Sequence, residues 1–434
     1  MKACILAAGR GKRLNPLTET KPKPIIPVGG KALLQHTIEM LEENGVKEIL
    51  LIVGYKKEMI KEKFKDGKDF GVALTYKEQK EFLGTGHATN IAKDFVGDDS
   101  FLLIYGDLLM DEHVFKRAIK AYNENKYQGV ITAMPVKDPT KFGILSTNSE
   151  GNLVKLVEKP PDDRYGNLAN AGVYIFSPNI FKAIEKTEKS PRGEYELTDA
   201  IEISLEERDI FHVVDIEDLF WSDVGHPWQL LDANKHFIES LQKGDKQISE
   251  YAIIEKPTTL KGIIKIGEGT TIKSGTYIEG PVIIGKNCEI GPNAYIRPFS
   301  VIGNGCKIGN SSEVKNTIVM QNSAIPHLSY AGDSIIGENV NLGCGTVFAN
   351  VRLDNENISM KIKGKRVDTH HRKIGAIVGD NVSFGINVCV MPGKKIGHNS
   401  QIGSNTVVSK DINANTLYYA TQDTSQKTIK AMKK

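Results

Sequence analysis

The stretch "IGEGTTIKSGTYIEGPVIIGKNCEIG", from Ile266 to Gly291, carries an isoleucine at every sixth residue. A period of six fits neither an α-helix, which repeats about every 3.6 residues, nor a single strand, which repeats about every two. It is typical of a hexapeptide coil, in which each short strand points one aliphatic side chain inward and a turn follows. The stretch therefore predicts a parallel β-helix.

The same spacing extends over most of the second half of the chain. The repeated positions are Ile266, Ile272, Ile278, Ile284, Ile290, Ile296, Ile302, Ile308 and Val314, then Ile336 and Leu342, then Val378, Phe384, Val390, Ile396, Ile402 and Val408. Between Asn350 and Lys373 the repeat stops at a polar, charged excursion that is longer than a turn, and such excursions are usually functional or mobile. Known hexapeptide families coil with a left hand, so we expect a left-handed β-helix.

The first half alternates between strand and helix patterns instead. "KACIL" and "KEILLIVG" are typical of buried strands, and "KALLQHTIEMLEENG" carries apolar residues at helical spacing before a terminal glycine. This alternation predicts a Rossmann-like α/β domain with a mostly parallel sheet. The polar link "ESLQKGDKQ" separates the halves, so we expect one domain over residues 1–245 and a β-helix domain over residues 250–434.

Composition excludes several function classes. The net charge of +3 is too small for a general binder of nucleic acids or membranes. We expect no signal peptide, because the chain leads almost directly into a strand pattern, and no apolar run approaches the roughly 18 residues of a membrane-spanning helix. The five cysteines are widely spaced and form no CxxC, which argues against disulfides or a zinc site. We expect a cytoplasmic protein with small-molecule partners and no nucleic-acid or membrane partner.

The first loop, "LAAGRGKRLNPLTETKPKP" from Leu6 to Pro24, is rich in glycine and positive charge. Gly9 and Gly11 allow backbone amides to approach a phosphate, and Arg13 and Lys23 can neutralise its charge. The loop matches neither GxxxxGK[ST] nor GxGxxG. Its residues alone leave two interpretations open, a phosphate-binding loop and a solvated basic loop. Ligands of such sheets bind beyond the carboxyl ends of strands, where Asp107 also lies.

A series of motifs over about 220 residues resembles the sugar-1-phosphate nucleotidylyltransferases, in that family's order. The motifs are "AAGRGKRL", "KPKPIIPVGGK", "GTGHA" at Gly84, "YGD" at Tyr105, "FGIL" at Phe142, "VEKP" at Val157, "NAGVYIF" at Asn170 and "WSDVG" at Trp221. In this family the phosphate of a sugar 1-phosphate attacks the α-phosphorus of a nucleoside triphosphate, and pyrophosphate leaves. The resemblance implies catalysis by positioning and charge neutralisation.

The resemblance also implies roles for single residues. Arg13 and Lys23 are the expected catalytic cations, and Asp107 and Asp223 are the expected Mg²⁺ ligands. Nucleotide contacts are expected at Ala8, Gly9, Gly11, Gln79, Gly84, Thr85 and Asp107, and sugar-phosphate contacts at Tyr105, Gly143, Glu158, Lys159 and Asn170. The Gln79 amide suits a pyrimidine. Asp223 is typical of dTDP-glucose enzymes, whereas bacterial N-acetylglucosamine-1-phosphate enzymes carry Asn, so base and sugar stay open.

In the second half, "PHLSYAGDSIIGENVNLGCGTVFAN", Pro326 to Asn350, resembles the acetyltransferase half of bifunctional N-acetylglucosamine-1-phosphate uridyltransferases. Its departures from the bacterial pattern resemble archaeal members. His327 is the expected general base for the attack of an amino-sugar amine on acetyl-CoA, although a structural histidine on a turn is the other interpretation. Further substrate contacts are expected at Arg297, Lys315, Tyr330, Asn341, Asn350 and Lys373, and acetyl-CoA contacts at Cys344, Ile386 and Ser404.

The two resemblances together predict a bifunctional enzyme. It acetylates glucosamine 1-phosphate with acetyl-CoA as co-substrate, then transfers a uridylyl group from UTP with Mg²⁺ to give UDP-N-acetylglucosamine. Left-handed β-helices usually associate as trimers, so we expect a homotrimer. The alternative is a glucose-1-phosphate thymidylyltransferase, or a GDP-mannose enzyme, whose β-helix serves only assembly or regulation. The residues do not rank UTP against dTTP, or glucosamine against galactosamine.

Overall fold

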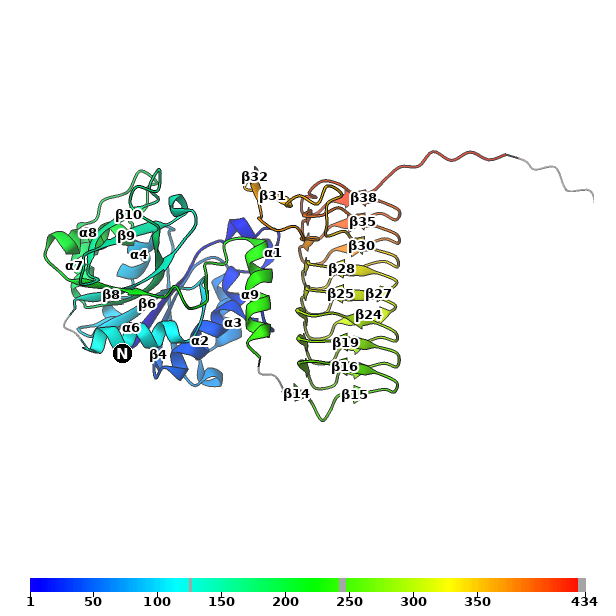
Figure 1. Ribbon diagram of the computed structural model, residues 1–434, viewed down its shortest axis with the longest axis horizontal. Coiled ribbons are helices and arrows are strands. Elements are labelled where there is room, and N and C mark those ends of the chain that lie inside the picture. Colours follow the sequence, from blue (N-terminus) through cyan, green and yellow to red (C-terminus); the bar gives the residue numbers. More distant parts are fainter. Residues whose placement is uncertain (125–126, 242–246, 428–434) are drawn as a thin grey trace, which may run out of the picture. The chain divides into compact units, whose positions relative to one another are not determined.

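The computed structural model describes residues 1–124, 127–241 and 247–427 (Figure 1). The chain divides into two compact units, one of Met1–Leu14 with Lys21–Ala233 and the other of Asn15–Thr20 with Asn234–Lys434. Separate hydrophobic cores fill the α/β sheet and the stacked coils. Within the ranges given above, no helix has the length and hydropathy needed to cross a membrane.

The first unit is built on a mixed sheet. Its strands run in the order β10-β9-β11-β6-β1-β4-β5, and β8 and β12 extend it from β11. The strand bounds are β1 (Lys2–Ala7), β4 (Glu48–Val53), β5 (Ala73–Glu78), β6 (Phe101–Tyr105), β8 (Gly129–Pro135), β9 (Gly143–Thr147), β10 (Leu153–Glu158), β11 (Leu168–Phe176) and β12 (Phe211–Asp215). Strands β5, β4, β1 and β6 are parallel, whereas β11 runs antiparallel to β6 and β8.

Helices cover both faces of this sheet. The helix bounds along the chain are α1 (Leu17–Thr20), which belongs to the second unit, α2 (Leu33–Glu43), α3 (Lys57–Phe64), α4 (Thr85–Asn90), α5 (Lys93–Val96), α6 (His113–Glu124), α7 (Asn179–Lys186), α8 (Leu197–Glu206) and α9 (Pro227–Glu239), in which the division between the units falls after Ala233. Side chains of α2, α3 and α6 pack on one face, and those of α4, α5, α7 and α8 on the other. Strand residues alternate between the two cores, with Ile5 on one side and Cys4 on the other. The predicted Rossmann-like α/β class is confirmed.

Short parallel strands of the second unit form the walls of a β-helix (Figure 1). The first wall holds β14 (Gln247–Ile248), β17 (Ile264–Ile266), β20 (Val282–Ile284), β23 (Ser300–Ile302), β26 (Ile318–Val319), β29 (Ile335–Ile336), β33 (Ile377–Val378) and β36 (Lys395–Ile396). The second holds β15 (Ile253–Ile254), β18 (Thr271–Ile272), β21 (Glu289–Ile290), β24 (Lys307–Asn310), β27 (Ala324–His327), β34 (Ser383–Phe384), β37 (Gln401–Ile402) and β39 (Leu417–Tyr418). The third holds β16 (Thr259–Lys261), β19 (Tyr277–Glu279), β22 (Tyr295–Ile296), β25 (Glu313–Lys315), β28 (Tyr330–Gly332), β30 (Val347–Phe348), β35 (Cys389–Val390) and β38 (Val407–Val408).

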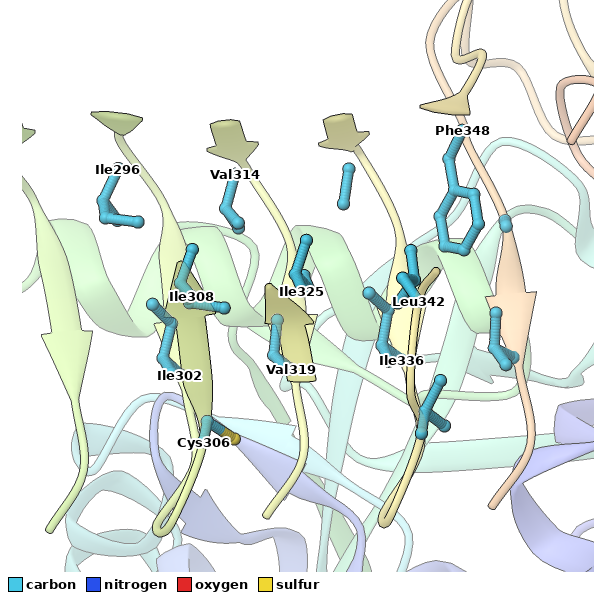
Figure 2. Packing of buried hydrophobic residues seen from close by; sticks show 14 of the residues in the cluster. Ile296, Ile302, Cys306, Ile308, Val314, Val319, Ile325, Ile336, Leu342 and Phe348 are labelled. Carbon is cyan, nitrogen blue, oxygen red and sulfur yellow. The ribbon is translucent and has the colours of Figure 1, made fainter. Parts of the chain in front are cut away.

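The sixth-residue positions form the core of this β-helix (Figure 2). Ile266, Ile284 and Ile302 pair in register, eighteen residues apart. Val319 and Ile336 then follow at steps of seventeen. The turns after Val314 and Ala331 are one residue shorter than those after Ile278 and Ile296, so a strict period of six misses the core positions Val319, Ile325 and Ala331 although the core continues.

Asparagines occupy the turns between walls. Asn339, Asn381, Asn399 and Asn415 all have φ between 55° and 58°, a left-handed conformation that asparagine tolerates better than most residues. Their side-chain amides bond to one another in a ladder, at 3.1, 3.0 and 3.1 Å. The ladder satisfies polar groups at each turn and fixes the register of successive coils.

The excursion between Asn350 and Lys373 contains an antiparallel hairpin, β31 (Ser359–Ile362) with β32 (Lys365–Asp368). Ile358, Met360 and Ile362 are buried. Ile358 lies against Gly393 in the turn after β35, where an added Cβ would approach it to 2.6 Å. The excursion is therefore an ordered element packed on the last coils.

Candidate active sites

The glycine-rich loop and Asp107 lie beyond the carboxyl ends of two neighbouring parallel strands. Leu6 of β1 pairs with Tyr105 of β6, and the Gly106 amide donates to the Leu6 carbonyl at 2.9 Å. Side chains are excluded here, because a Cβ on Gly106 would lie 2.9 Å from that carbonyl oxygen. The close approach of the two strands brings the loop and Asp107 to one edge of the sheet, as the sequence predicts.

Lys23 contacts two other predicted site residues of the first unit, Asp107 and Asp223. It begins the short 3-10 helix η2 (Lys23–Ile25), and only 7% of its side chain is exposed. Its ammonium donates to Asp107 Oδ2 at 2.9 Å and to the backbone carbonyl of Asp223 at 2.9 Å. Residues more than 80 positions apart in the sequence thus meet at one buried positive charge.

Asp223 also connects to Arg13 of the 3-10 helix η1 (Lys12–Leu14). Arg13 Nη2 lies 3.9 Å from Asp223 Oδ2, and Gln229 donates to Asp223 Oδ1 at 2.9 Å. Gly225 leaves room for Arg13, because a Cβ there would lie 2.9 Å from the guanidinium. Burial lowers the pKa of the neighbouring His226, which contacts the same Gln229. The sequence interpretation did not identify Gln229 or His226, which follow the "WSDVG" motif.

The two acids fit a divalent cation that shares its coordination with a ligand. Lys23 contacts the carboxylate of Asp107 and the backbone carbonyl of Asp223, which brings these two residues to the same place. Their carboxylates offer the hard oxygen ligands that Mg²⁺ prefers. In the described part of the chain, no group of three or more His, Cys, Asp and Glu side chains is arranged to hold a metal by itself. Two carboxylates therefore suit an ion whose remaining ligands come from phosphates and water.

Gln79 and Gly84 meet at the other end of the loop region. Gln79 is buried, and its amide nitrogen lies 3.0 Å from the Gly84 carbonyl and 3.1 Å from His87 Nδ1. Gly84 has φ +98°, and a Cβ there would lie 2.5 Å from the Tyr195 carbonyl oxygen. Thr85 begins α4 and accepts the Leu197 amide at 3.1 Å. A small residue is thus required where the chain passes close to Tyr195.

Arg10 belongs to this region, although the sequence interpretation gave it no role. Its guanidinium lies 5.5 Å from the ring centre of Phe82 and 5.9 Å from that of Tyr55. Phe82 is exposed, so the ring offers a partly open flat surface beside the loop. A basic residue between two glycines of the loop was the available signal.

Tyr105, Asn170 and Tyr174 form a hydrogen-bonded chain on β6 and β11. Asn170 donates to Tyr174 Oη at 2.7 Å, and Tyr174 donates to Tyr105 Oη at 3.0 Å. Burial raises the pKa of both tyrosines, so both hydroxyls stay protonated. Gly172, with φ +77°, lies against the Tyr105 ring. Tyr174 lies in the "NAGVYIF" motif, but the sequence interpretation gave it no role.

Glu158 and Lys159 pair with each other at the end of β10, at 2.5 Å. Arg192 lies 3.4 Å from the same carboxylate and 2.8 Å from Glu196. Gly143 faces Glu158 closely, since a Cβ there would lie 3.0 Å from Glu158 Oε2. The predicted sugar-phosphate residues of this strand pair therefore lie together, with Arg192 as an additional cation.

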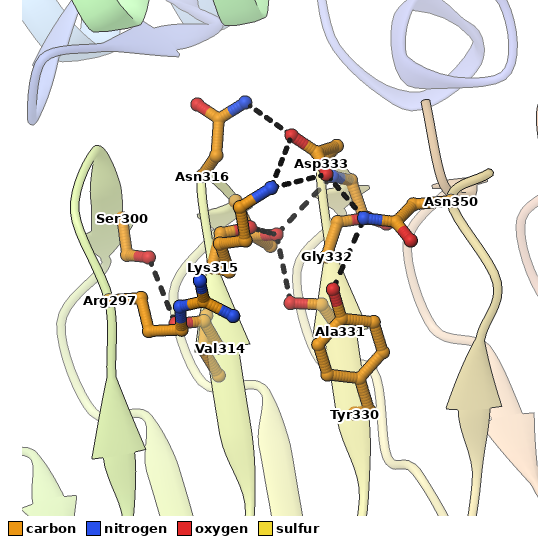
Figure 3. Close-up of polar contacts among 12 residues, drawn as sticks. Arg297, Ser300, Val314, Lys315, Asn316, Tyr330, Ala331, Gly332, Asp333 and Asn350 are labelled. Atoms are coloured by element: carbon orange, nitrogen blue, oxygen red, sulfur yellow. Dashed lines mark hydrogen bonds and ion pairs between the residues drawn. The ribbon is translucent and has the colours of Figure 1, made fainter. Parts of the chain in front are cut away.

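In the β-helix, predicted substrate residues form a column along one corner (Figure 3). Arg297 and Lys315 align on successive coils at the ends of the third-wall strands, and Lys315 pairs with Gly332. Asp333 and Asn350 align with each other one position further along. Lys315 donates to Asp333 Oδ2 at 3.1 Å, and Asn316 donates to Asp333 Oδ1 at 2.8 Å. Asn350 donates both to Asp333 and, at 3.1 Å, to Tyr330 Oη. Asp333 is 4% exposed and is the centre of the group, although the sequence interpretation assigned it no role.

Arg297 stands at the start of this column. Its Nη1 donates to Glu313 at 2.8 Å, and that contact raises the pKa of the guanidinium. The buried Nε of Arg297 has no hydrogen-bond partner among the described residues. A charged group with an unused donor is suited to an anionic ligand.

His327 and the predicted acetyl-CoA residues form a second column at another corner. Strand register aligns His327, Cys344, Ile386 and Ser404 on successive coils. The His327 carbonyl accepts the Gly345 amide at 3.2 Å, and the Ile386 amide donates to Ser404 Oγ at 3.2 Å. His327 is exposed, and 51% of Ile386 is exposed.

Asn341 and Lys373 lie outside these contacts. Asn341 lies in the second wall between β27 and β34, where its backbone pairs with Ala324 and Ser383. It precedes Cys344, at the corner, by three residues. That separation is about 10 Å along a strand. Lys373 is exposed and pairs through its backbone with Val351, next to Asn350. One chain therefore assembles the predicted residues in two columns and leaves Asn341 apart from both.

Three family models match successive parts of the chain. The nucleotidyl transferase family model matches residues 2–240. The model of the GMPPB C-terminal domain matches residues 278–391, and that of the hexapeptide repeat of succinyl-transferase matches residues 375–410. The predicted left-handed β-helix of hexapeptide repeats is confirmed.

Curated relatives match nearly the whole chain. The bifunctional protein GlmU of Methanocaldococcus jannaschii is 44% identical over 96% of this chain and 97% of its own length. The bifunctional sugar-1-phosphate nucleotidylyltransferase/acetyltransferase of Sulfurisphaera tokodaii is 41% identical over 95% of this chain and 98% of its own. Among solved structures, a putative glucose-1-phosphate thymidylyltransferase from Bacillus anthracis is 28% identical, with a TM-score of 0.51, over 56% of this chain and 98% of its own.

Proposed function

The chain belongs to the family of bifunctional GlmU proteins, sugar-1-phosphate nucleotidylyltransferases joined to acetyltransferases, and we propose that it performs two consecutive steps of UDP-N-acetylglucosamine synthesis. The second unit acetylates glucosamine 1-phosphate with acetyl-CoA. The first then transfers a uridylyl group from UTP to the acetylated sugar phosphate. We assign these activities to residues 250–434 and 1–245 respectively.

In the first unit, Lys23 and Arg13 neutralise the phosphates while the sugar phosphate attacks the α-phosphorus and pyrophosphate leaves. Charge neutralisation by a buried, preorganised ammonium is strong, because the group needs little reorganisation during the reaction. Gln79 and Gly84 hold the base, and Tyr105, Asn170 and Glu158 hold the sugar. Asp107 and Asp223 would hold Mg²⁺, which supplies further charge neutralisation on the phosphates when bound.

In the second unit, Arg297 and Lys315 bind the phosphate of glucosamine 1-phosphate. Neutral His327 accepts a proton from the 2-amino group as the nitrogen attacks the thioester carbonyl, and the CoA thiolate leaves. Cys344, Ile386 and Ser404 line the path of acetyl-CoA along the second column. The two columns carry this proposal, because a β-helix used only for assembly has no need of a hydrogen-bonded Lys315–Asp333–Asn350 network around a buried carboxylate, or of an exposed histidine in line with Cys344 and Ile386.

A homotrimer would bring Asn341 of one copy to the columns of another. The outward face of the third wall supports this. Tyr330, Val347, Cys389 and Val407 pair in register along it, and Val347 and Val407 are 38% and 54% exposed. Such a row of uncovered apolar side chains is typical of an interaction surface. Sedimentation of Val347→Glu/Val407→Glu should show monomers, whereas Val154→Glu, at an exposed position of β10, should remain trimeric.

The first experiment is CoA release from acetyl-CoA with glucosamine 1-phosphate and, separately, galactosamine 1-phosphate. We expect release with the wild type, none above background with His327→Ala, and wild-type rates with His370→Asn, an exposed histidine of the excursion. The amino sugar that supports release identifies the acceptor. Silence with both sugars would reject the acetyltransferase assignment and leave the β-helix an assembly or regulatory role.

A further inference from the structure

A cavity of about 1240 Å³ lies within the second unit, between hairpin β31–β32 and the turns of the last coils. Lys361 and Arg366 of the hairpin line one side, and residues of the turns after β35 and β38 line the other. None of the residues assigned to acetyl transfer contributes to its wall. Ligand pockets typically enclose about 300–1,000 Å³, so the cavity has room for a nucleotide-sized molecule.

The wall of this cavity carries an excess of positive charge. Its cations are Lys361, Arg366, Lys394, Lys395 and Lys410, and its carboxylates are Glu19 and Asp411. Glu19 already contacts His398 at 2.9 Å, and Asp411 lies 3.8 Å from Lys395 Nζ. Within the described ranges, no carboxylate lies within 4.0 Å of a side-chain nitrogen of Lys361, Arg366, Lys394 or Lys410.

Lys395 is a partly buried cation of this wall and lies close to the other positive charges. Its side chain is 17% exposed, and its ammonium donates to the backbone carbonyl of Lys361. Burial lowers the pKa of Lys395, and the charge of Lys361 lowers it further, against the opposing effects of Asp411 and Glu19. Like charges held together in a poorly solvated place are unfavourable unless an anion joins them.

We infer that this cavity is a binding site for an anion with two or more linked phosphates. The cations come from three separate segments, the hairpin and two turns, and five cations against two carboxylates suit an anion that carries more than one phosphate group. Tyr418 also lines the cavity, with its ring centre 5.6 Å from Lys410 Nζ, and offers a surface on which a nucleobase can stack. Pyrophosphate, UTP and CoA all carry the required linked phosphates.

Calorimetric titration of the full-length protein tests this site. The cavity variant is Lys361→Gln/Lys410→Gln, and the matched control is Lys363→Gln/Lys365→Gln, which removes the same charge from the same region without touching the wall. With pyrophosphate as probe, we expect the cavity variant to lose one site per chain, or to bind it at least tenfold more weakly, relative to wild type and control. Equal melting temperatures of the two variants show that both are folded; Lys394→Gln replaces the cavity variant if they differ.

Repeating the titration with UTP, CoA and orthophosphate identifies the ligand. Loss with pyrophosphate, UTP and CoA alike means that linked phosphates suffice, and loss with only one nucleotide means that its nucleoside is also recognised. Equal binding by both variants with every probe overturns the site. Orthophosphate binding as tightly as pyrophosphate, with the same loss in the cavity variant, overturns the requirement for linked phosphates.

Discussion

The two candidate sites are assembled by different rules. In the β-helix, Arg297 and Lys315 lie eighteen residues apart and Asp333 and Asn350 seventeen, which is the length of one coil in each case, so spacing in the chain brings each pair together in space. In the first unit, Arg13, Lys23, Asp107 and Asp223 share no spacing and meet only because each lies near the carboxyl edge of the sheet. In a repeat, the number of residues per coil determines which side chains meet. In an α/β sheet, the order and direction of the strands determine it.

Removing Lys23 should give the largest difference between the two regions. Lys23→Ala takes away the buried ammonium between Asp107 and Asp223, so we expect kcat for nucleotidyl transfer to fall on the order of 10²–10³-fold. Acetyl transfer should be unchanged, because no acetyl-transfer residue depends on Lys23. Steady-state rates of both reactions measure this, with the exposed Lys12→Ala as control. Equal losses in both reactions would contradict the independence of the two sites.

Truncation in each core should destabilise one region at a time. Ile308→Ala removes a fully buried side chain from the stacked coils, at a cost of about 2–5 kcal/mol. Coils of a repeat contact mainly their neighbours, so the loss stays in the β-helix. The acetyltransferase activity should be lost at a lower temperature than in the wild type, while the temperature at which nucleotidyl transfer is lost should not change. Ile104→Ala in β6 should lower the inactivation temperature of nucleotidyl transfer and leave that of acetyl transfer unchanged. Loss of both activities at the same lowered temperature in either variant would show that the units unfold together.

Asp333→Asn sharpens the comparison within the column. The substitution keeps the shape but removes the charge that holds Lys315, and we expect kcat/KM for glucosamine 1-phosphate to fall about tenfold, or about 1.4 kcal/mol. Because Lys315 binds the phosphate, the change should lie in KM for the sugar and leave KM for acetyl-CoA unaltered. Asp354→Asn, in the exposed part of the excursion, is the control. A change in kcat alone would assign Asp333 a different role.

The smallest expected effect concerns pH and only the first unit. Burial lowers the pKa of His36 from 6.5, so the folded protein holds it neutral and the unfolded chain binds more protons below that pH. Its contribution to stability is present above pH 6.5 and is lost as the pH falls, by on the order of 1 kcal/mol per pH unit. Urea unfolding at pH 7.5 and 5.5, followed by the fluorescence of Trp221 and Trp228, should show a smaller pH effect in His36→Gln. If the pH dependence of the unfolding free energy is the same in His36→Gln as in the wild type, other groups cause it.

The fold was predictable where the sequence repeats a physical pattern. Inward isoleucines at every sixth residue predicted the coils, and alternating strand and helix patterns predicted the α/β unit. Two features of the fold were not predicted from the sequence. The shorter turns after Val314 and Ala331 keep the core continuous while breaking the count, and β11 runs antiparallel because of pairing with β6 and β8.

The motifs identified charged residues that lie close together in the structure, and the sequence interpretation gave no role to several of their hydrogen-bond partners. Lys23, Asp107 and Asp223 stood in motifs, and the structure joins them. Asp333, Tyr174 and Gln229 form hydrogen bonds to predicted site residues. Asp333 and Tyr174 stand inside quoted motifs and Gln229 follows one, but their hydrogen-bond partners become evident only in the folded structure. Arg192 meets Glu158 through folding alone.

The mixture of seventeen- and eighteen-residue coils has a consequence for how such chains change length. A residue lost from a turn leaves the aliphatic stack in place, as Val319 and Ile336 show. A residue lost inside a strand would turn its polar neighbour inward, against the alternation that buries Ile302. Insertions and deletions among related chains should therefore collect at the corners, and whole coils should be gained or lost more readily than single strand residues.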